Sequence, residues 1–240
     1  MSFGLARGRT LDAGGIGITD AELPPLPDRA NNATIETTRV DPRAWFARPD
    51  LPLEIEIGSG KGTFLVQQCE LQPDTNFLGI EWAKEFYAYA ADRLRRRAVT
   101  NVRMLHGDAT AFVHWRVPTG IVRTVHLYFS DPWPKKRHHK RRVVQDSFLT
   151  DIHRILIPGG ELRIVTDHDD YWVWMEEHFG RWTTPGTNPM GLTPAPFQRI
   201  PFERPASAAE GETVGTNFER KYAREGRPFH ATTLRKPAES

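Results

Sequence analysis

Short apolar runs alternate with segments of helical periodicity from Leu53 onward. This alternation is typical of βαβ units, in which helices connect the strands of a largely parallel sheet. Strands are predicted at residues 53–57, 76–81, 102–106, 122–129, 161–166 and 229–234. Helices are predicted at residues 63–70, 84–97, 109–115, 143–156, 169–179 and 217–225. The pattern therefore predicts an α/β fold.

Two segments depart from this alternation. Residues 1–40 contain several glycines and prolines but few large apolar side chains, so we expect a flexible N-terminal arm there. Residues 182–205 contain six prolines, which is too many for a continuous helix or a central strand. We interpret this stretch as a long connection or lid within a single domain that covers residues 41–240.

Composition narrows the class of protein further. Hydrophobic residues make up 39% and charged residues 26% of the 240, which excludes collagen-like, coiled-coil and wholly disordered chains. The single cysteine, Cys69, allows neither an intramolecular disulfide nor a CxxC metal site. No stretch approaches the roughly 18 apolar residues that a membrane-spanning helix needs. We therefore expect a cytoplasmic protein without a membrane partner.

The net charge of +2 conceals a strongly uneven distribution of charge. Residues 135–142 read KKRHHKRR and carry six cations without an acid, and four arginines lie within residues 93–97. Without these groups the remaining chain has an excess of acids. Either group alone is typical of a solvated charged face, but together on an acidic background they favour a polyanionic partner.

A glycine-rich turn follows the first predicted strand in the segment LEIEIGSGKG. It is not a phosphate-binding P-loop, because Lys61 is followed by Gly62 instead of serine or threonine. It is not a dinucleotide fingerprint either, because Thr63 stands where the third glycine belongs. A loop for S-adenosylmethionine fits, with Glu56 near the cationic part of that ligand. A turn without any ligand fits this segment alone equally well.

Acidic side chains follow the next four predicted strands at Glu81, Asp108, Asp131 and Asp167. Glu81 is placed to accept hydrogen bonds from the ribose hydroxyls of an adenosine cofactor. Asp108 could accept from an adenine amino group or cap the following helix. The prolines of the SDPWP turn hold Asp131 at a strand end. Because ligands of open parallel sheets lie at the carboxyl ends of the strands, the ordered acids favour a binding site.

The histidines do not indicate a metal site. His126, His138 and His139 have no spacing with carboxylates that is typical of zinc ligands. The segment GTNFERKYAREG is compatible with an ordinary capped helix, and spacing alone does not decide its role. We therefore predict no metal.

Six segments in this order resemble the tRNA (guanine-N7-)-methyltransferase family: LEIEIGSGKG, LGIEW, GDA, YFSDPWPKKRHHKRR, IVTDHDDY and GTNFERKY. The resemblance extends over about residues 53–235, and SDPWPKKRHHKRR and TNFE are its most specific parts. It implies a Rossmann-like class I methyltransferase fold, with a mostly parallel seven-stranded sheet and helices on both faces. It also implies methyl transfer from S-adenosyl-L-methionine to N7 of guanine 46 in the variable loop of tRNA.

The resemblance also assigns roles to individual residues. Those implied to contact the cofactor are Glu56, Gly58, Gly60, Glu81, Asp108 and Asp131, and Asp131 is also implied to be catalytic. Those implied to bind the substrate are Lys135, Asp167, Thr216, Asn217, Phe218 and Glu219. Those implied to contact RNA are Arg137, His138, His139, Lys140, Arg141 and Arg142.

Three alternative functions remain open from the residues themselves. The first is methyl transfer to another RNA or a small substrate. The second is a nicotinamide-dependent oxidoreductase, which would lack its third glycine and would not need a basic run beside the site. The third is a non-catalytic RNA-binding module, which would not need ordered acids at four strand ends. A monomer, a homodimer and a helper subunit are all compatible with the sequence.

Overall fold

A computed structural model describes residues 5, 8–26 and 38–238 of the chain. The chain divides into two compact units, Met1–Pro118 and Thr119–Ser240. The single domain expected over residues 41–240 stays a prediction. Each unit is described by itself.

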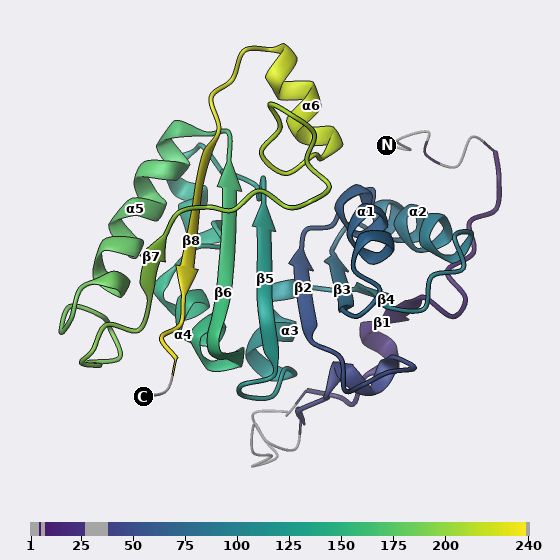
Figure 1. The fold of residues 1–240 in the computed structure, drawn as a ribbon, viewed down its shortest axis with the longest axis horizontal. Helices are drawn as coiled ribbons and strands as arrows, with labels where there is room; N and C mark the ends of the chain where they lie inside the picture. Colours follow the sequence, from purple (N-terminus) through teal and green to yellow (C-terminus); the bar gives the residue numbers. More distant parts are fainter. Residues whose placement is uncertain (1–4, 6–7, 27–37, 239–240) are drawn as a thin grey trace. The chain divides into compact units, whose positions relative to one another are not determined.

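The N-terminal unit is built on four parallel strands in the order β1-β4-β3-β2 (Figure 1). The strands are β1 (Gly17–Thr19), β2 (Leu53–Ile57), β3 (Asn76–Glu81) and β4 (Val102–His106). β2 and β3 are buried along their whole length, as expected for strands covered by helices on both faces. The bounds of β2, β3 and β4 match the predicted ranges.

Helices cover these strands with apolar side chains. The helical elements are α1 (Thr63–Leu71), α2 (Lys84–Arg95), α3 (Ala109–Trp115) and the 3-10 turns η1 (Asp20–Glu22) and η3 (Pro42–Trp45). One core cluster joins Leu65 of α1, Ala90 and Leu94 of α2, Phe77 of β3 and Met104 of β4. Burial of these side chains provides the main stabilisation of the unit.

Part of the predicted flexible arm is folded onto the N-terminal unit. Ile16 is 5% exposed and belongs to the core cluster, and β1 pairs with β4 as a parallel edge strand. Arg9 forms an ion pair with the buried Asp92 of α2 at 2.8 Å. Burial of Ile16 and the ion pair of Arg9 therefore hold this part of the arm on the unit, which its composition did not predict. The rest of the arm, residues 1–4, 6–7 and 27–37, lies outside the described residues.

The C-terminal unit contains four further strands in the order β5-β6-β8-β7. They are β5 (Val122–Tyr128), β6 (Leu156–Thr166), β7 (Gln198–Ile200) and β8 (His230–Arg235). β5 and β6 are parallel, whereas β8 is antiparallel to both β6 and β7. In Figure 1 the arrow of β8 accordingly points opposite to that of β6.

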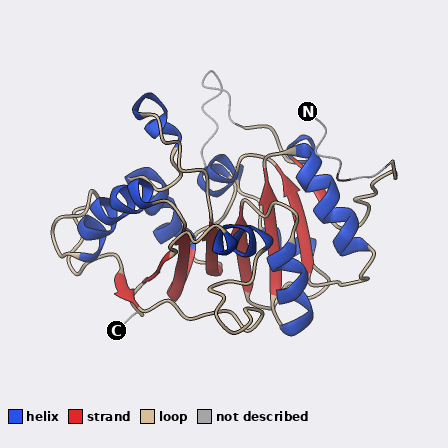
Figure 2. Ribbon diagram, turned by 90° about the horizontal axis from the view of Figure 1, so that it is seen from above, coloured by secondary structure: helices blue, strands red, loops and turns tan. Residues whose placement is uncertain are grey.

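The helical elements of this unit include the aromatic-rich α5. They are η4 (Lys136–Arg141), α4 (Asp146–Ile155), α5 (Asp169–Thr183) and α6 (Asn217–Arg224). Tyr171, Phe179 and Trp182 of α5 are fully buried, and Trp182 packs on Phe197 from the proline-rich connection. Figure 2 shows helices in blue flanking the strands in red. No helix of the described residues is long and apolar enough to span a membrane.

The described residues contain eight strands, where the resemblance implies seven. The additional strand is β1, which lies in the predicted arm. β7 lies inside the proline-rich segment 182–205, where no strand was located from the sequence. The mostly parallel α/β class is confirmed.

Candidate functional site

The turn after β2 leaves open space beside its glycines. Gly58 and Gly60 adopt φ values of 77° and 52°, in the left-handed region that favours glycine. A Cβ atom added at either position would meet no heavy atom within 4 Å. The amides of Gly58 and Ser59 donate to the Ile80 carbonyl of β3 at 2.8 and 3.2 Å. The loop is therefore fixed by β3 and is open to a closely approaching ligand.

Glu56 is a buried acid with one unsatisfied carboxylate oxygen among the described residues. Its side chain lies within β2 and the residue is 5% exposed, and Oε2 is buried without a hydrogen-bond partner among the described residues. Burial raises the pKa of Glu56 to about 8; a hydrogen bond from Ser59 opposes the shift and the charge of Glu81 adds to it. Such a carboxylate stabilises a cationic group that reaches it.

Glu81 holds the glycine-rich loop in place. Its Oε2 accepts the backbone N–H of Gly60 at 2.8 Å, and its Oε1 accepts that of Ala83 at 2.8 Å. Charge-assisted hydrogen bonds of this kind are stronger than neutral ones. Glu81, which is predicted to accept hydrogen bonds from ribose hydroxyls, therefore also fixes the conformation of the glycine-rich loop.

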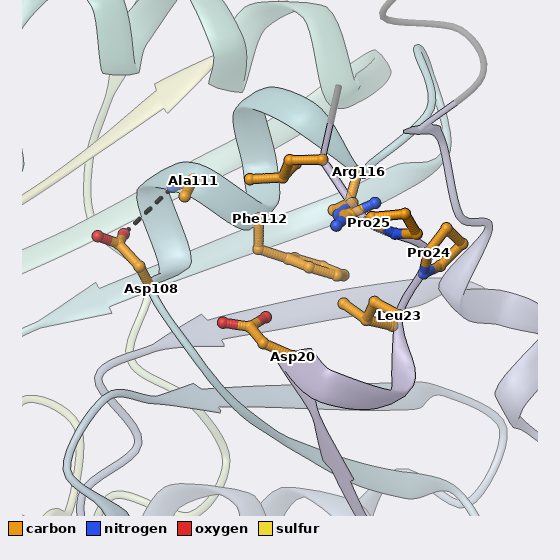
Figure 3. Close-up of a pocket in the computed structure, with 9 residues that line it drawn as sticks. Asp20, Leu23, Pro24, Pro25, Asp108, Ala111, Phe112 and Arg116 are labelled. Carbon is orange, nitrogen blue, oxygen red and sulfur yellow. Dashed lines mark hydrogen bonds between the residues drawn. The ribbon is translucent and has the colours of Figure 1, made fainter. Parts of the chain in front are cut away.

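Asp108 caps α3, which is one of the two roles predicted for it. Its Oδ1 accepts the backbone N–H groups of Thr110 at 2.8 Å and Ala111 at 3.1 Å, and also the Thr110 hydroxyl. The residue is exposed, and all three of these bonds use the same oxygen atom. Figure 3 shows the bond to Ala111. A cap of this kind contributes about 1 kcal/mol and leaves Oδ2 available to a ligand.

A pocket of about 270 Å³ lies beside Asp108 within the same unit (Figure 3). Its lining residues are Asp20, Leu23, Pro24, Pro25, Leu26, Asp108, Ala111, Phe112 and Arg116. The carboxylate of Asp20 lies so close to Gly107 that a Cβ there would come within 2.6 Å of it. Burial raises the pKa of Asp20, and the charge of Arg116 opposes that shift.

The sequence did not point to Asp20, because it lies in the predicted arm. A local signal was nevertheless present, since Thr19 and Glu22 have the spacing of a capping box. The Glu22 carboxylate accepts both the backbone N–H and the hydroxyl of Thr19 at 2.7 Å.

The turn after β5 is strained on both sides of Asp131. Phe129 and Trp133 adopt φ values of 55° and 42°, which cost about 1–3 kcal/mol each for residues with a side chain. Trp133 is held by the ring of His138 at 5.8 Å and by the guanidinium of Arg141 at 4.9 Å. Asp131 is exposed and its carboxylate accepts no hydrogen bond from the described residues. The turn therefore presents a charged acceptor that the fold itself does not use.

The basic run forms the 3-10 helix η4 and presents most of its cations to solvent. The exposed residues are Lys135, Lys136, Arg137, Lys140 and Arg141. His138 and His139 are half-buried, and His139 packs against Trp174 at 5.6 Å. Exposed cations in one short segment form the kind of surface that binds phosphates.

Arg142 differs from its neighbours, and the structure corrects its implied contact with RNA. Its side chain is 1% exposed, so no surface is left for RNA. Nε donates to the Pro132 carbonyl at 2.8 Å, and the guanidinium forms an ion pair with Asp170 and lies over the rings of Tyr171 and Trp174. Arg142 therefore anchors the SDPWP turn to α5.

Three of the four arginines within residues 93–97 form ion pairs within the N-terminal unit. Arg95 and Arg96 both contact Asp92, at 3.3 and 3.1 Å, and Arg97 contacts Glu70. Arg9, Arg95 and Arg96 share the single acid Asp92, so the group keeps an excess of positive charge. Its part in a polyanion-binding surface stays a prediction.

The TNFE segment begins α6 and has two internal supports. Thr216 caps the helix by accepting the backbone N–H of Glu219 at 3.1 Å. The carboxylate of Glu219, 2% exposed, accepts the backbone N–H groups of Thr213, Val214 at 2.9 Å and Gly215 at 2.8 Å. Glu219 therefore positions the loop before α6 through its buried carboxylate.

The same segment presents side chains outward. Asn217 is exposed, and Phe218 is 53% exposed and stacks on Phe129 with ring centroids 6.2 Å apart. Phe129 directly precedes the SDPWP turn, so the stacking brings TNFE close to that turn. Asp167, directly after β6, is half-buried and accepts a hydrogen bond from Arg227 at 2.8 Å. Figure 1 shows α6 beyond the carboxyl ends of β5 and β6.

The predicted residues therefore fall into two clusters, one in each unit. Glu56, Gly58, Gly60 and Glu81 meet at the carboxyl ends of the paired strands β2 and β3, with Asp108 at the end of β4. The C-terminal unit holds Asp131, Lys135, Asp167, the basic run and the TNFE segment. No group of three or more His, Cys, Asp or Glu residues in the described ranges could hold a metal ion.

Comparison with known proteins gives the family. The family model described as "Putative methyltransferase" matches residues 50–188. A tRNA (guanine-N(7)-)-methyltransferase of Corynebacterium diphtheriae is 39% identical over 158 residues, which cover 66% of this chain and 60% of that protein. Relatives with the same name from Rhodopirellula baltica and Streptococcus thermophilus are 36% and 32% identical. The matches cover 78% and 75% of this chain and 67% and 79% of those proteins.

The solved structures with similar folds agree on the architecture. The aminoglycoside resistance methyltransferase NpmB1 aligns with a TM-score of 0.50 at 19% identity, over 77% of this chain and 87% of its own. The antibiotic-resistance methyltransferase Kmr aligns with the same TM-score at 18% identity, over 79% and 88%. These likenesses show the fold alone. The sequence relatives show more, and the chain belongs to the tRNA (guanine-N(7)-)-methyltransferase family.

Proposed function

We propose that this protein transfers a methyl group from S-adenosyl-L-methionine to N7 of a guanine in tRNA, and that guanine 46 of the variable loop is the target. The observation that carries the proposal is the buried carboxylate of Glu56, whose Oε2 accepts no hydrogen bond from the described residues, beside an open glycine-rich loop. A cationic ligand that approaches the backbone closely fits that arrangement. The family supplies the class of reaction and of substrate.

The residues of the N-terminal unit fit S-adenosyl-L-methionine. The cofactor supplies an electrophilic methyl group on a positively charged sulfur. Glu56 would compensate positive charge of the ligand, Gly58 and Gly60 would allow close approach, and Glu81 and Asp108 would accept hydrogen bonds from its adenosine part. The free acceptors that support this assignment are Glu56 Oε2 and the unused oxygen of Asp108.

Asp131 is the proposed catalytic residue and a further cofactor contact. Guanine N7 has a lone pair at neutral pH, so its attack on the methyl group needs positioning more than a strong base. Methylation leaves a positive charge on the purine, and a carboxylate already in place stabilises that charge as it develops. The strained turn and the absence of a hydrogen-bond partner from the described residues suit Asp131 to this role.

Base selection is assigned to Asp167. Guanine offers the N1–H and the N2 amino group as adjacent donors, which a carboxylate accepts and which adenine does not have. Lys135, Thr216, Asn217 and Phe218 are proposed to bind the substrate as well. Glu219 supports them indirectly, through the loop amides that it holds.

The tRNA backbone is assigned to the exposed cations of the basic run. Arg137, Lys140 and Arg141, with the half-buried His138 and His139, would neutralise phosphates next to the target base. The aromatic rings of Phe218 and Phe129 offer a face on which an unstacked base could lie. A cytoplasmic enzyme that acts as a monomer or homodimer is consistent with this substrate.

A tRNA transcript with 7-deazaguanine at position 46 tests both the atom and the position. This base keeps its pairing edge but has no N7, so we expect methyl transfer from tritiated cofactor to fall to background. A transcript with 7-deazaguanine at a different position serves as the control and is expected to be methylated normally. Undiminished transfer to the position-46 transcript would show that the target is a different atom or nucleotide.

A further inference from the structure

Asp167 is not an open acceptor, because an arginine already binds it. Nη1 of Arg227 donates to Asp167 Oδ2 at 2.8 Å. The Asp167 side chain is 12% exposed, whereas that of Arg227 is 43% exposed. The acid is therefore the more buried partner of this pair, and the arginine is the more exposed one.

Arg227 is held by groups of its own turn as well as by Asp167. Its Cζ lies 3.9 Å from the ring centroid of Tyr222, Nη2 contacts Glu225 at 3.1 Å, and its backbone N–H donates to the Tyr222 carbonyl at 3.2 Å. These contacts would keep the guanidinium near Asp167 even after the pair between them separated.

The guanidinium donates to Asp167 through Nη1, while Nη2 contacts Glu225. A guanidinium presents neighbouring N–H donors in one plane, and guanine presents its N1–H and N2 amino group in the same way. We propose that Arg227 is a placeholder for the target base: it fills the guanine-recognition acceptor Asp167 in the free protein and is displaced when guanine enters. This inference rests on the proposed role of Asp167.

A placeholder contributes to specificity. A base with both donors replaces the hydrogen bonding that Asp167 loses when Arg227 leaves, whereas adenine and the pyrimidines leave the carboxylate poorly paired. The pair must also be weak enough to open, and partly exposed ion pairs are weak because water screens them. The contact therefore lowers the apparent affinity for guanine modestly, by about two- to fivefold.

Titration with guanosine, followed by NMR chemical-shift changes, tests the inference without activity as the readout. Guanosine carries no phosphate, so a freed Arg227 gains no ionic contact with the probe. We expect Arg227→Ala to bind guanosine about two- to fivefold more tightly than the wild type. Arg224→Ala removes an exposed cation from the last turn of α6 and is expected to leave guanosine binding unchanged.

A double-mutant cycle separates competition from a general effect on structure. In an Asp167→Asn background there is no ion pair to open, so adding Arg227→Ala is expected to change guanosine binding by less than the difference seen in the wild-type background. Arg227→Lys keeps the charge without the planar pair of donors and is expected to bind guanosine with intermediate affinity. It also serves as the test variant if Arg227→Ala does not fold.

Weaker or unchanged guanosine binding by Arg227→Ala would overturn the inference. An equal effect of Arg227→Ala on guanosine binding in the Asp167→Asn background would overturn it as well. Formation of 7-methylguanosine in tRNA by the wild type, measured in parallel, separates this failure from failure of the proposed function. If the wild type methylates tRNA but Arg227→Ala shows no gain, only the placeholder role is wrong. If the wild type forms no 7-methylguanosine, the proposed function is wrong and the placeholder role falls with it.

Discussion

The carboxylate of Glu81 accepts the backbone N–H of Gly60 at 2.8 Å and thereby ties the end of β3 to the glycine-rich loop after β2. Its second oxygen accepts the N–H of Ala83, so one acid fixes two turns at the carboxyl ends of β2 and β3. Glu81 therefore has a structural task in addition to its proposed contact with the ribose.

Replacing Glu81 by glutamine is expected to weaken S-adenosyl-L-methionine binding about tenfold or more. The amide nitrogen would face an N–H donor, so at least one charge-assisted hydrogen bond of about 1.5–3 kcal/mol is lost. Calorimetry measures the affinity, and Glu85→Gln, an exposed acid in the first turn of α2, is the control. Equal affinities for the wild type and Glu81→Gln would contradict this account of the loop.

The raised pKa of Glu56 predicts how stability changes with pH. The folded protein keeps Glu56 protonated up to about pH 8, whereas the unfolded chain loses that proton near its ordinary pKa of 4.5. Between these values the folded state binds more protons, so the wild type loses stability as pH rises, by at most about 1.4 kcal/mol per pH unit. Glu56→Gln removes this contribution.

Urea unfolding of both proteins without ligand, at several pH values from 4.5 to 8, measures the effect. The stability of Glu56→Gln relative to the wild type is expected to increase across this window and to level off above it. Cofactor binding to the wild type is expected to strengthen over the same window, because a cationic ligand favours the ionised carboxylate. A stability difference that does not change with pH would contradict the assignment.

Two neighbouring arginines of the basic run are expected to behave differently. Arg142→Ala removes a buried guanidinium from the Pro132 carbonyl and Asp170, so the free energy of unfolding should fall by about 2–4 kcal/mol. Arg141→Ala, at the exposed neighbour, should cost at most about 1 kcal/mol.

The salt dependence of tRNA binding should change more for Arg141→Ala than for Arg142→Ala. Loss of one phosphate contact lowers the slope of log affinity against log salt by about 0.9, and we expect this reduction for Arg141→Ala. Arg142→Ala, compared at a temperature where it is folded, should keep the wild-type slope. A reduced slope for Arg142→Ala, without a reduced slope for Arg141→Ala, would show that Arg142 contacts RNA.

Glu219→Gln tests whether that acid supports the loop before α6. The wild-type carboxylate accepts three backbone N–H groups, and the amide leaves at least one buried donor unpaired, which costs about 1–3 kcal/mol. Hydrogen exchange of residues 213–216 should accelerate. Glu210→Gln, at an exposed acid in the same connection, is expected to leave exchange unchanged.

Much of the fold could be predicted because apolar periodicity and turn residues agree with each other. β2, β3, β4 and α3 match their predicted bounds. β6 is longer than predicted, because Pro158 and two glycines resemble a turn, whereas the structure continues the strand through them. Three-residue strands such as β1 and β7 carry too few side chains for a periodic signal.

The candidate site was predictable in its residue types but less so in their contacts. A run of eight basic or histidine residues gives no sign that Arg142 is buried, because its partners Pro132 and Asp170 are fixed only by tertiary packing. The placement of Arg227 against Asp167 depends likewise on two residues 60 positions apart. Sequence spacing does not encode contacts of that range.

Nucleoside mass spectrometry of tRNA, after incubation with the protein and S-adenosyl-L-methionine, tests the central claim most directly. We predict that 7-methylguanosine forms with the wild type and that its rate of formation falls at least about a hundredfold with Asp131→Ala, because a fixed charge stabiliser is lost. Absence of 7-methylguanosine with the folded wild-type protein, or an undiminished rate for Asp131→Ala at saturating cofactor and tRNA, would contradict it.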